Sequence, residues 1–556
     1  MQIPVSELIV KYLERLGIEY IFGMPGAHIL PVYNSLFDSS IKTILAKHEQ
    51  GAAFMAGGYA RASGKIGACI TTAGPGATNL VTGIANAYVD KQPILIITGE
   101  TSTHIFGKGG LQESSGEGGS IDQVALFSGI TKYNRIVERT DYLANVLNRA
   151  SKILFSENPG PVLLSFPFNV QKEMVDDSIL DAIKTEKDHT PFIIDARLPN
   201  LLTDLIIQSE RPVIVAGYGC ISSDSQQLVS DLSEMMNIPV TTSLKAKGVI
   251  SEQSALSLGS LGVTSYSGAY QYILDKADLV IFLGASFNER TSYVWNDALL
   301  KNKKIAQVDN DVEQIEKVYK ADLAINGDIK AVLKRVLEKL GQSDINKKLF
   351  SGAAEVVDNA ETQMPATNYD GFRATFPLAE KFFDELVKQF PSDIMLFDDN
   401  IIFAQNFFNV SAANRYFSNS GVSSLGHAIP AAIGARFSVD KPVFAVLGDG
   451  GFQMCCMEIM TAVNYNLPLT IVMFNNSTMG LIRKNQFQQY EKRFISCDFI
   501  NPDYAYLCKS FGINYKQVTT EADLDGLFDS VDCIGAINLI EIMIDKDQFP
   551  SYSSRR

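Results

Sequence analysis

Two short apolar runs, separated by a glycine turn and a helical segment, constrain the fold of this chain more than any other feature. Residues 443–447 and 469–474 have the length and composition of buried parallel strands. Gly448-Asp449-Gly450 ends the first run, a helix is predicted from about 453 to 464, and Asn475-Asn476 ends the second run. This order predicts a strand, a crossover helix and a second strand, and in such units ligands bind at the carboxyl ends of the strands.

Asp449 and Asn476 therefore stand at the ends of two strands that we expect to be neighbours. Their side-chain oxygens are hard ligands which, with a backbone carbonyl, water and phosphate oxygens, suit octahedral Mg²⁺. The glycines let the backbone come close to phosphate groups, and the following helix offers free N–H groups. The pattern predicts a diphosphate held through a metal ion, although a lone Gly-Asp-Gly is also typical of an ordinary tight turn.

The Gly-Asp-Gly, the 24 residues that follow it and the Asn-Asn pair together resemble the motif of thiamine diphosphate (ThDP) enzymes. A second segment, Lys47-His48-Glu49-Gln50-Gly51, resembles the part of those enzymes that carries their glutamate. Alone, Glu49 is an acid in the first turn of a helix, where the helix dipole favours its ionised form. The resemblance implies that Glu49 hydrogen-bonds the aminopyrimidine ring and so promotes loss of the thiazolium C2 proton.

The turn at residues 71–79, which contains Gly74-Pro75-Gly76, resembles the corresponding turn of the acetohydroxyacid (acetolactate) synthase branch of that family. Leu425 matches the bulky residue that holds ThDP in a V shape, with an ordinary Leu at a helix start as the alternative. The backbone of Thr478 would complete the metal shell. The resemblance implies cofactor contacts at Pro25, Gly26, Glu49, Thr72, Gly74, Asn79, Asp399, Asn400, Ser423, Leu425, Gly448, Asp449, Gly450, Gly451, Asn476, Thr478, Met479 and Gly480, and metal ligands at Asp449, Asn476 and Thr478.

His28 and Gln112 lie in segments that resemble the active site of benzaldehyde lyase and related acyloin lyases, where a His and a Gln orient the substrate. A surface histidine is the alternative for His28. The chain has only five His, and His104 stands alone where pyruvate decarboxylases carry an adjacent His pair, which argues against simple decarboxylation. The segment at 113–120 is either a loop that shapes the acceptor pocket or a surface turn.

Two further segments leave questions open. Arg483, Lys484 and Asn485 differ from the anabolic acetohydroxyacid synthases and could recognise an anionic acceptor or form a solvated loop. Residues 284–290 and 258–262 resemble the segments that hold FAD in acetohydroxyacid synthases. No clear Gly-x-Gly-x-x-Gly accompanies them, and some relatives bind no flavin, so FAD remains an open option.

Length and composition frame these motifs. With 556 residues, we expect three α/β domains with doubly wound parallel sheets: a pyrimidine-binding domain at 1–175, a central domain at 190–340 and a diphosphate-binding domain at 365–550. A net charge of −14 argues against nucleic-acid binding. No apolar run reaches membrane-spanning length, and no signal-peptide pattern opens the chain, so we expect a cytoplasmic protein. The seven Cys show no metal or disulfide spacing.

The resemblance covers essentially the whole chain and implies a carboligase. Such an enzyme decarboxylates a 2-oxo acid, pyruvate by default, and adds the acyl unit to a second carbonyl, with Glu49, Gln112 and His28 as the catalytic residues. It also implies a homodimer or homotetramer with active sites between subunits. The alternatives are an acyloin or diketone lyase, a carboligase with a specialised acceptor such as a keto sugar, a dinucleotide-binding oxidoreductase, and a catalytically silent structural subunit.

Overall fold

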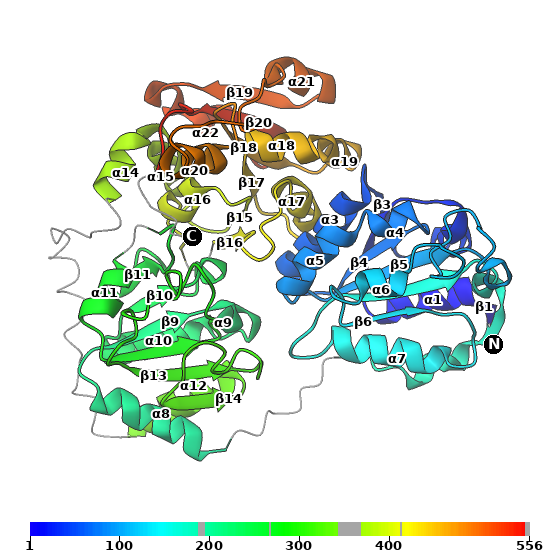
Figure 1. The fold of residues 1–556 in the computed structure, drawn as a ribbon, viewed down its shortest axis with the longest axis horizontal. Coiled ribbons are helices and arrows are strands. Elements are labelled where there is room, and N and C mark those ends of the chain that lie inside the picture. The colour runs from blue at the N-terminus through cyan, green and yellow to red at the C-terminus, as the bar shows by residue number, and fades with distance from the viewer. Residues whose placement is uncertain (187–194, 266–267, 343–368, 412–413, 551–556) are drawn as a thin grey trace.

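Three six-stranded parallel sheets, each covered by helices, build the molecule (Figure 1). The computed structural model describes residues 1–186, 195–265, 268–342, 369–411 and 414–550. The predicted fold class is confirmed, since each sheet is doubly wound with crossover helices between parallel strands. The predicted domain limits stay predictions, although each sheet falls within one of the three ranges.

The first sheet has the strand order β3-β2-β4-β5-β7-β6, so β3 is an edge strand. Its strands are β2 (Tyr20–Gly23), β3 (Lys42–Leu45), β4 (Gly67–Thr71), β5 (Ile94–Glu100), β6 (Tyr133–Ile136) and β7 (Val162–Pro167). Its helices are α1 (Val5–Arg15), α2 (Leu30–Phe37), α3 (Glu49–Ser63), α4 (Pro75–Thr78), α5 (Val81–Val89), α6 (Gln123–Phe127) and α7 (Leu143–Leu154). A separate antiparallel pair, β1 (Gln2–Pro4) and β8 (Met174–Asp176), ties the start of the chain to the end of this domain.

The central sheet has the order β11-β10-β9-β12-β13-β14. Its strands are β9 (Pro212–Ala216), β10 (Val240–Thr242), β11 (Ser257–Ser260), β12 (Leu279–Leu283), β13 (Lys304–Asp309) and β14 (Leu323–Asn326). The helices around it are α8 (Arg197–Gln208), α9 (Tyr218–Ser222), α10 (Gln226–Met236), α11 (Ala269–Asp275) and α12 (Ile329–Gln342).

The third sheet has the order β16-β15-β17-β18-β20-β19. Its strands are β15 (Met395–Asp398), β16 (Arg415–Ser418), β17 (Val443–Gly448), β18 (Leu469–Asn475), β19 (Asn514–Val518) and β20 (Ile537–Met543). Its helices are α14 (Tyr369–Thr375), α15 (Pro377–Gln389), α16 (Ile402–Phe407), α17 (Ala428–Arg436), α18 (Asp449–Cys455), α19 (Ile459–Asn464), α20 (Gly480–Gln489), α21 (Tyr504–Phe511) and α22 (Leu527–Ser530).

Helices α3 and α17 join the first and third domains and lie side by side in Figure 1. A Cβ on Gly58 would stand 1.9 Å from the carbonyl oxygen of Ala431, and a Cβ on Gly434 would stand 1.9 Å from that of Met55. Only glycine lets the two backbones approach this closely. The small residues of α3 therefore serve the contact between domains, and the buried residues of both helices belong to one apolar core.

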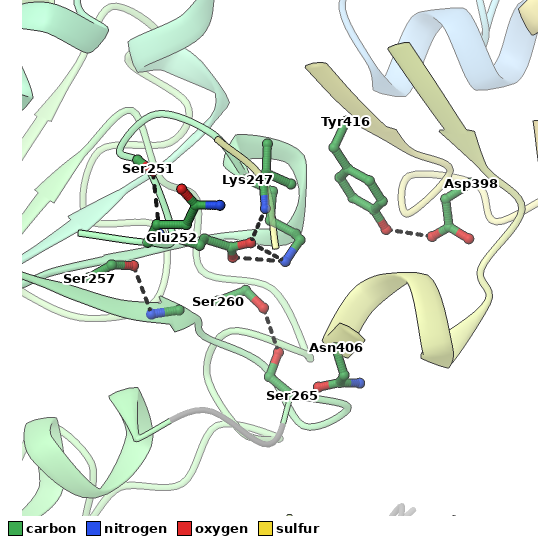
Figure 2. A network of polar contacts seen from close by, with 12 residues as sticks. Lys247, Ser251, Glu252, Ser257, Ser260, Ser265, Asp398, Asn406 and Tyr416 are labelled. Carbon is green, nitrogen blue, oxygen red and sulfur yellow. Dashed lines mark hydrogen bonds and ion pairs between the residues drawn. The ribbon is translucent and has the colours of Figure 1, made fainter. Parts of the chain in front are cut away.

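A buried ion pair of the central domain lies beside the third domain (Figure 2). Lys247 lies 2.6 Å from a carboxylate oxygen of Glu252, and both side chains are almost fully buried. Glu252 also accepts a hydrogen bond from the backbone N–H of Val410 in the third domain, at 2.9 Å. Beside it, the Tyr416 hydroxyl donates to Asp398 at 2.5 Å. The central domain thus contacts the segment at Val410, which precedes β16, the strand paired with β15 and Asp398.

β17 and β18 lie where the sequence predicts strands, at 443–447 and 469–474, and the helix between them differs from its predicted limits. The helix predicted from about 453 begins four residues earlier, at Asp449, and a 3₁₀ turn, η6 (Cys456–Glu458), interrupts it before α19. The chain between the expected first and central domains begins with the last residue of β8 and a 3₁₀ helix, η4 (Asp177–Ala182), which buries Leu180 against the first domain. Within the described residues, no helix combines the length and apolar character needed to cross a bilayer.

Candidate active site

The predicted metal ligands stand at one edge of the third sheet. β17 and β18 are parallel neighbours with Gly448 opposite Phe474, so Asp449 and Asn476 follow at adjacent strand ends. Asp449 is buried, and its Oδ2 accepts the backbone N–H of Ser477 at 2.7 Å. Burial raises the pKa of Asp449, while hydrogen bonds from Asn501 and nearby backbone groups lower it. These bonds fix the orientation of the Asp449 carboxylate, one of the predicted metal ligands.

Sequence reasoning missed Asn501, which contacts this edge. Its side-chain N–H group donates to Asp449 Oδ2 and to Asn475 Oδ1, each at 2.8 Å. Its carbonyl oxygen accepts from Gln453 Nε2 at 2.7 Å and from the Tyr504 hydroxyl at 3.0 Å, which fixes the amide. Asn501 lies in a loop before α21, and no spacing in the sequence connects it to the Gly-Asp-Gly turn.

Glycines leave space around Asp449 and Asn476, the two predicted side-chain metal ligands. A Cβ on Gly450 would stand 2.7 Å from Met479 Sδ, and one on Gly480 would stand 2.8 Å from Asn476 Nδ2. Gly451 leaves similar room beside the carboxylate of Asp399. Larger residues would close the cradle, so this edge fits a diphosphate and its metal ion.

Two neighbouring residues adopt the left-handed conformation that favours glycine. Asn400, just past β15, has φ 65°, and Ser423 has φ 61°. The Asn400 side-chain oxygen is buried and accepts no hydrogen bond in the described part of the chain, so it is free to receive a donor from a ligand. The Thr478 hydroxyl donates to the carbonyl of Cys497 at 2.9 Å, and the part of its backbone in a metal shell stays a prediction.

Asp399 holds the loop that carries Leu425. Its buried carboxylate accepts the backbone N–H of Gly426 at 2.6 Å, that of His427 at 3.3 Å and the Asn419 amide at 3.0 Å. Burial raises the pKa of Asp399 to about 7. The Asp399 carboxylate is thus bonded within the protein and fixes the backbone next to Leu425, while its predicted contact with a cofactor stays a prediction.

Glu49 is the first residue of α3, as predicted. The His48 ring caps the helix by accepting the backbone N–H of Gln50 at 3.1 Å. Asn79 donates its side-chain N–H to Glu49 Oε2 at 2.9 Å. The structure brings together two residues that the sequence separates by 30 positions, and it leaves the Glu49 side chain partly accessible.

His28, Gln112 and Thr72 form a second cluster in the first domain. His28 Nδ1 lies 3.2 Å from Gln112 Oε1, and the Thr72 hydroxyl lies 3.4 Å from the same oxygen. Gly26 and Gly74 leave room for the Thr72 and Gln112 side chains. A Cβ on Gly26 would stand 2.5 Å from Thr72 Cβ, and one on Gly74 would stand 3.0 Å from Gln112 Cβ. The pair predicted from separate segments is therefore a contacting pair at the carboxyl ends of β2, β4 and β5.

Glu100, at the end of β5, fixes the backbone of the loop that carries Gln112. Its Oε1 accepts the backbone N–H of Thr101 at 2.7 Å and that of Ser114 at 3.0 Å. Burial raises the pKa of Glu100 to about 7. The segment expected to be an insertion or a surface turn is ordered at its start by Glu113, which accepts the N–H groups of Gly107 and Gly110.

A cavity of about 780 Å³ lies between the central domain and the other two. It is lined by Gly219, Gly284, Arg290, Asp309 and Ser423, among others. A Cβ on Gly219 would stand 2.6 Å from the Cα of Gly284, so only glycine lets the two turns approach each other this closely. Arg290 keeps one buried guanidinium nitrogen without a hydrogen-bond partner among the described residues. This volume and donor set fit a nucleotide with a phosphate group.

The structure changes the interpretation of Arg483 and Lys484. Arg483 is buried and donates to Asp498 at 2.6 Å and to Asp547 at 2.7 Å, so its charge is already neutralised within the chain. Lys484 is also buried, and burial lowers its pKa to about 8. Both residues lie in α20, not in a solvated loop.

Models of thiamine pyrophosphate enzymes match all three domains. The N-terminal binding domain matches residues 3–126, the central domain matches 200–336, and the C-terminal binding domain matches 400–532. The chain belongs to the thiamine pyrophosphate enzyme family. Glu49 and Asn79 fall in the first match, and Asp449, Asn476 and Asn501 fall in the third.

Relatives of known name extend this likeness over almost the whole chain. A probable acetolactate synthase large subunit of Methanococcus aeolicus is 33% identical over 95% of this chain and 90% of that protein. The acetolactate synthase large subunit of Lactococcus lactis is 32% identical over 92% of this chain and 88% of that protein. The acetolactate synthase isozyme 2 large subunit of Escherichia coli is 28% identical over 97% and 95%, respectively. The resemblance to the acetolactate synthase branch is confirmed.

Proposed function

We propose that this protein is a ThDP- and Mg²⁺-dependent carboligase that decarboxylates pyruvate and joins the two-carbon unit to a second carbonyl compound. The observation that carries the proposal is the meeting of Asp449 and Asn476 at one sheet edge, in a chain similar to acetolactate synthase large subunits along almost its whole length. The intact Glu49 and its bond from Asn79 argue against a catalytically silent subunit.

Each residue then has a defined task. Bound ThDP supplies the nucleophilic carbon and the electron sink of the reaction. Asp449, Asn476 and the carbonyl of Thr478 hold the Mg²⁺ ion, and the glycines around them admit the diphosphate. Glu49, oriented by Asn79, exchanges a proton with a ring nitrogen of the aminopyrimidine. Leu425, next to the backbone that Asp399 fixes, would contact the bound cofactor.

His28 and Gln112 orient the substrate carbonyl and hydroxyl groups. Their 3.2 Å contact fixes both side chains, and Thr72 restricts Gln112 further. Fixed donors stabilise developing charge at no cost in reorganisation. The enzyme takes a 2-oxo acid as donor and a carbonyl compound as acceptor, and this cluster lines the acceptor side.

We infer that the active site forms between two subunits of a homodimer or homotetramer. The family resemblance supports this, since it implies that the Glu-bearing domain of one subunit faces the diphosphate-binding domain of another. A shared site supplies Glu49 from one subunit and the metal edge from the other. Sedimentation of the loaded protein tests this, and a catalytically active monomer would contradict it.

The cavity between the domains supports FAD as a second cofactor. Its volume suits a dinucleotide, and Arg290 offers a donor to a phosphate group. Flavin fluorescence in the supernatant of the heat-denatured protein tests for FAD directly, and Arg290→Ala should lower the flavin content.

The decisive experiment incubates the purified protein with ThDP, Mg²⁺ and pyruvate, follows CO₂ release, and identifies products by mass spectrometry. Acetolactate or acetoin as product supports the proposal. An absence of pyruvate consumption, with ThDP demonstrably bound, would refute pyruvate as donor and direct the search to acyloins and diketones. Glu49→Gln serves as the inactive control.

A further inference from the structure

Helix α19 and the residue that follows it contact the edge strand β3, which leads to Glu49. The Tyr465 hydroxyl accepts the backbone N–H of Leu45 at 2.8 Å and lies 3.3 Å from the carbonyl oxygen of Thr43. The Thr461 hydroxyl lies 3.4 Å from the carbonyl oxygen of Leu45. These side chains occupy edge positions of the first sheet that no strand covers. The third domain therefore fixes the path of the chain just before the catalytic helix.

Glu458 continues this contact to the residues next to Glu49. Its Oε1 accepts the backbone N–H groups of Lys47 at 3.0 Å and of His48 at 2.9 Å. Its Oε2 accepts the Thr461 hydroxyl at 2.9 Å, and the residue is 3% exposed. Hydrogen bonds to a buried carboxylate are among the strong ones. Glu458 therefore fixes the backbone N–H groups of two consecutive residues, the second of which directly precedes Glu49.

Gly51 admits the Glu458 carboxylate. A Cβ at Gly51 would stand 2.3 Å from Glu458 Oε1 and 2.6 Å from its Cδ. Gly51 lies in the first turn of α3, where glycine otherwise costs helix stability relative to alanine. The presence of glycine at position 51 is therefore explained by the space that the Glu458 carboxylate requires.

The same segment connects this contact with the metal edge. α18 begins at Asp449 and continues into η6, which ends at Glu458. Within one chain, Glu458 thus links the helix that starts at the metal ligand to the helix that starts at Glu49. Asn79 holds the Glu49 carboxylate, and Glu458 holds the backbone that carries it.

We propose that Glu458 is the positioning residue for Glu49, and that its two bonds to the Lys47 and His48 peptides set the orientation in which Glu49 activates ThDP. The inference rests on the proposed function. Errors of about 1 Å in the placement of a catalytic group can cost about 100-fold in rate. Loss of Glu458 should therefore slow cofactor activation more than it weakens cofactor binding.

The test measures exchange of the C2 proton of bound ThDP for deuterium by quenched-flow NMR, without substrate. Glu458→Ala should exchange about 10- to 100-fold more slowly than wild type, with the half-saturating ThDP concentration changed less than about threefold. Glu458→Gln keeps an oxygen acceptor for both peptides and should stay within about threefold of wild type. Tyr465→Phe, the matched control, loosens the same domain contact further from Glu49 and should also stay within about threefold.

Gly51→Ala provides a second route that does not depend on how well Glu458→Ala folds. Its added methyl group displaces the Glu458 carboxylate while favouring the helix, so exchange should slow by about 10-fold. Wild-type exchange in a folded Glu458→Ala or Gly51→Ala variant would overturn the inference. Slowing by Tyr465→Phe as large as by Glu458→Ala would overturn it too, because the effect would then belong to the whole domain contact. No exchange in wild type, or normal exchange in Glu49→Gln, would instead refute the proposed function itself.

Discussion

The side-chain N–H group of Asn501 lies 2.8 Å from Oδ2 of Asp449, across 52 residues of sequence. A second bond from the same nitrogen to Asn475 Oδ1 has the same length. Asn501 therefore fixes both the proposed metal-binding carboxylate and the residue before the second ligand, Asn476. Groups that orient metal ligands in this way contribute to affinity without touching the ion.

Asn501→Ala should weaken Mg²⁺ binding by about 10- to 100-fold, the usual effect of removing a group that orients a metal ligand. Calorimetric titration of Mg²⁺ in the presence of ThDP measures this. Gln453→Ala is the control. It removes one bond to Asn501, but Tyr504 still holds the amide, so Mg²⁺ affinity should change by less than about threefold. Equal affinity in Asn501→Ala and wild type would contradict the assignment.

Glu49→Gln should lower kcat by at least about 100-fold, because a neutral amide cannot exchange the proton that the proposed reaction requires. The fold should persist, since Glu49 is partly exposed at a helix start and Asn79 can bond to the amide oxygen. Pyruvate turnover and far-ultraviolet circular dichroism measure the two effects. Asn79→Ala should reduce kcat less, by about 10-fold, because the carboxylate stays but loses its orientation. Full activity in Glu49→Gln would refute the mechanism.

Much of the fold could be predicted because the buried strands are nearly continuous apolar runs bounded by glycine and proline. β17 and β18 each extend one residue past their predicted limits of 443–447 and 469–474. The helix after the Gly-Asp-Gly turn was predicted to begin too late because Gly450 and Gly451 are poor helix formers, while the contacts of Asp449 with Ser477 and Asn501 fix the start of α18.

Contacts that depend on distant loops could not be predicted. Glu458 and Asn501 bond to residues 410 and 52 positions away, and neither forms part of a spacing pattern. Arg483 was misinterpreted for a related reason. A basic residue near the predicted site suggested anion recognition, but in the structure two aspartates from later segments form ion pairs with it. The Glu49–Asn79 and His28–Gln112 pairs were found as separate residues because family motifs mark each one.

Gln112→Ala should raise the KM for the carbonyl acceptor by about 3- to 10-fold, the cost of one hydrogen bond to the substrate. His28→Ala should act in the same direction. Because the two side chains are 3.2 Å apart and each fixes the other, the double variant should lose less than the product of the single effects. Steady-state kinetics of the four proteins measure the coupling. Strictly multiplicative effects would show that the pair does not act as a unit.

Glu100→Gln should stabilise the protein more at high pH than at low pH. The pKa of Glu100 is about 7 in the folded protein against 4.5 as its ordinary value, so its burial costs stability that grows as pH rises from 4.5 to 7 and is constant above. Between about pH 5.5 and about pH 8 the variant should gain about 2 kcal/mol relative to wild type. Calorimetric melting at both pH values tests this. A pH-independent difference would contradict the raised pKa.

Glu252→Ala should destabilise the protein by about 3–5 kcal/mol, because it leaves the buried Lys247 ammonium without its counter-charge. It also removes the acceptor for the Val410 N–H, so the central domain should loosen from the third domain. Replacing both partners, as Lys247→Met with Glu252→Met, should recover most of the loss, since an apolar pair of similar volume needs no counter-charge. Melting temperatures of the single and double variants measure the recovery. A double variant no more stable than Glu252→Ala would show that the Val410 contact, and not the buried charge, sets the cost.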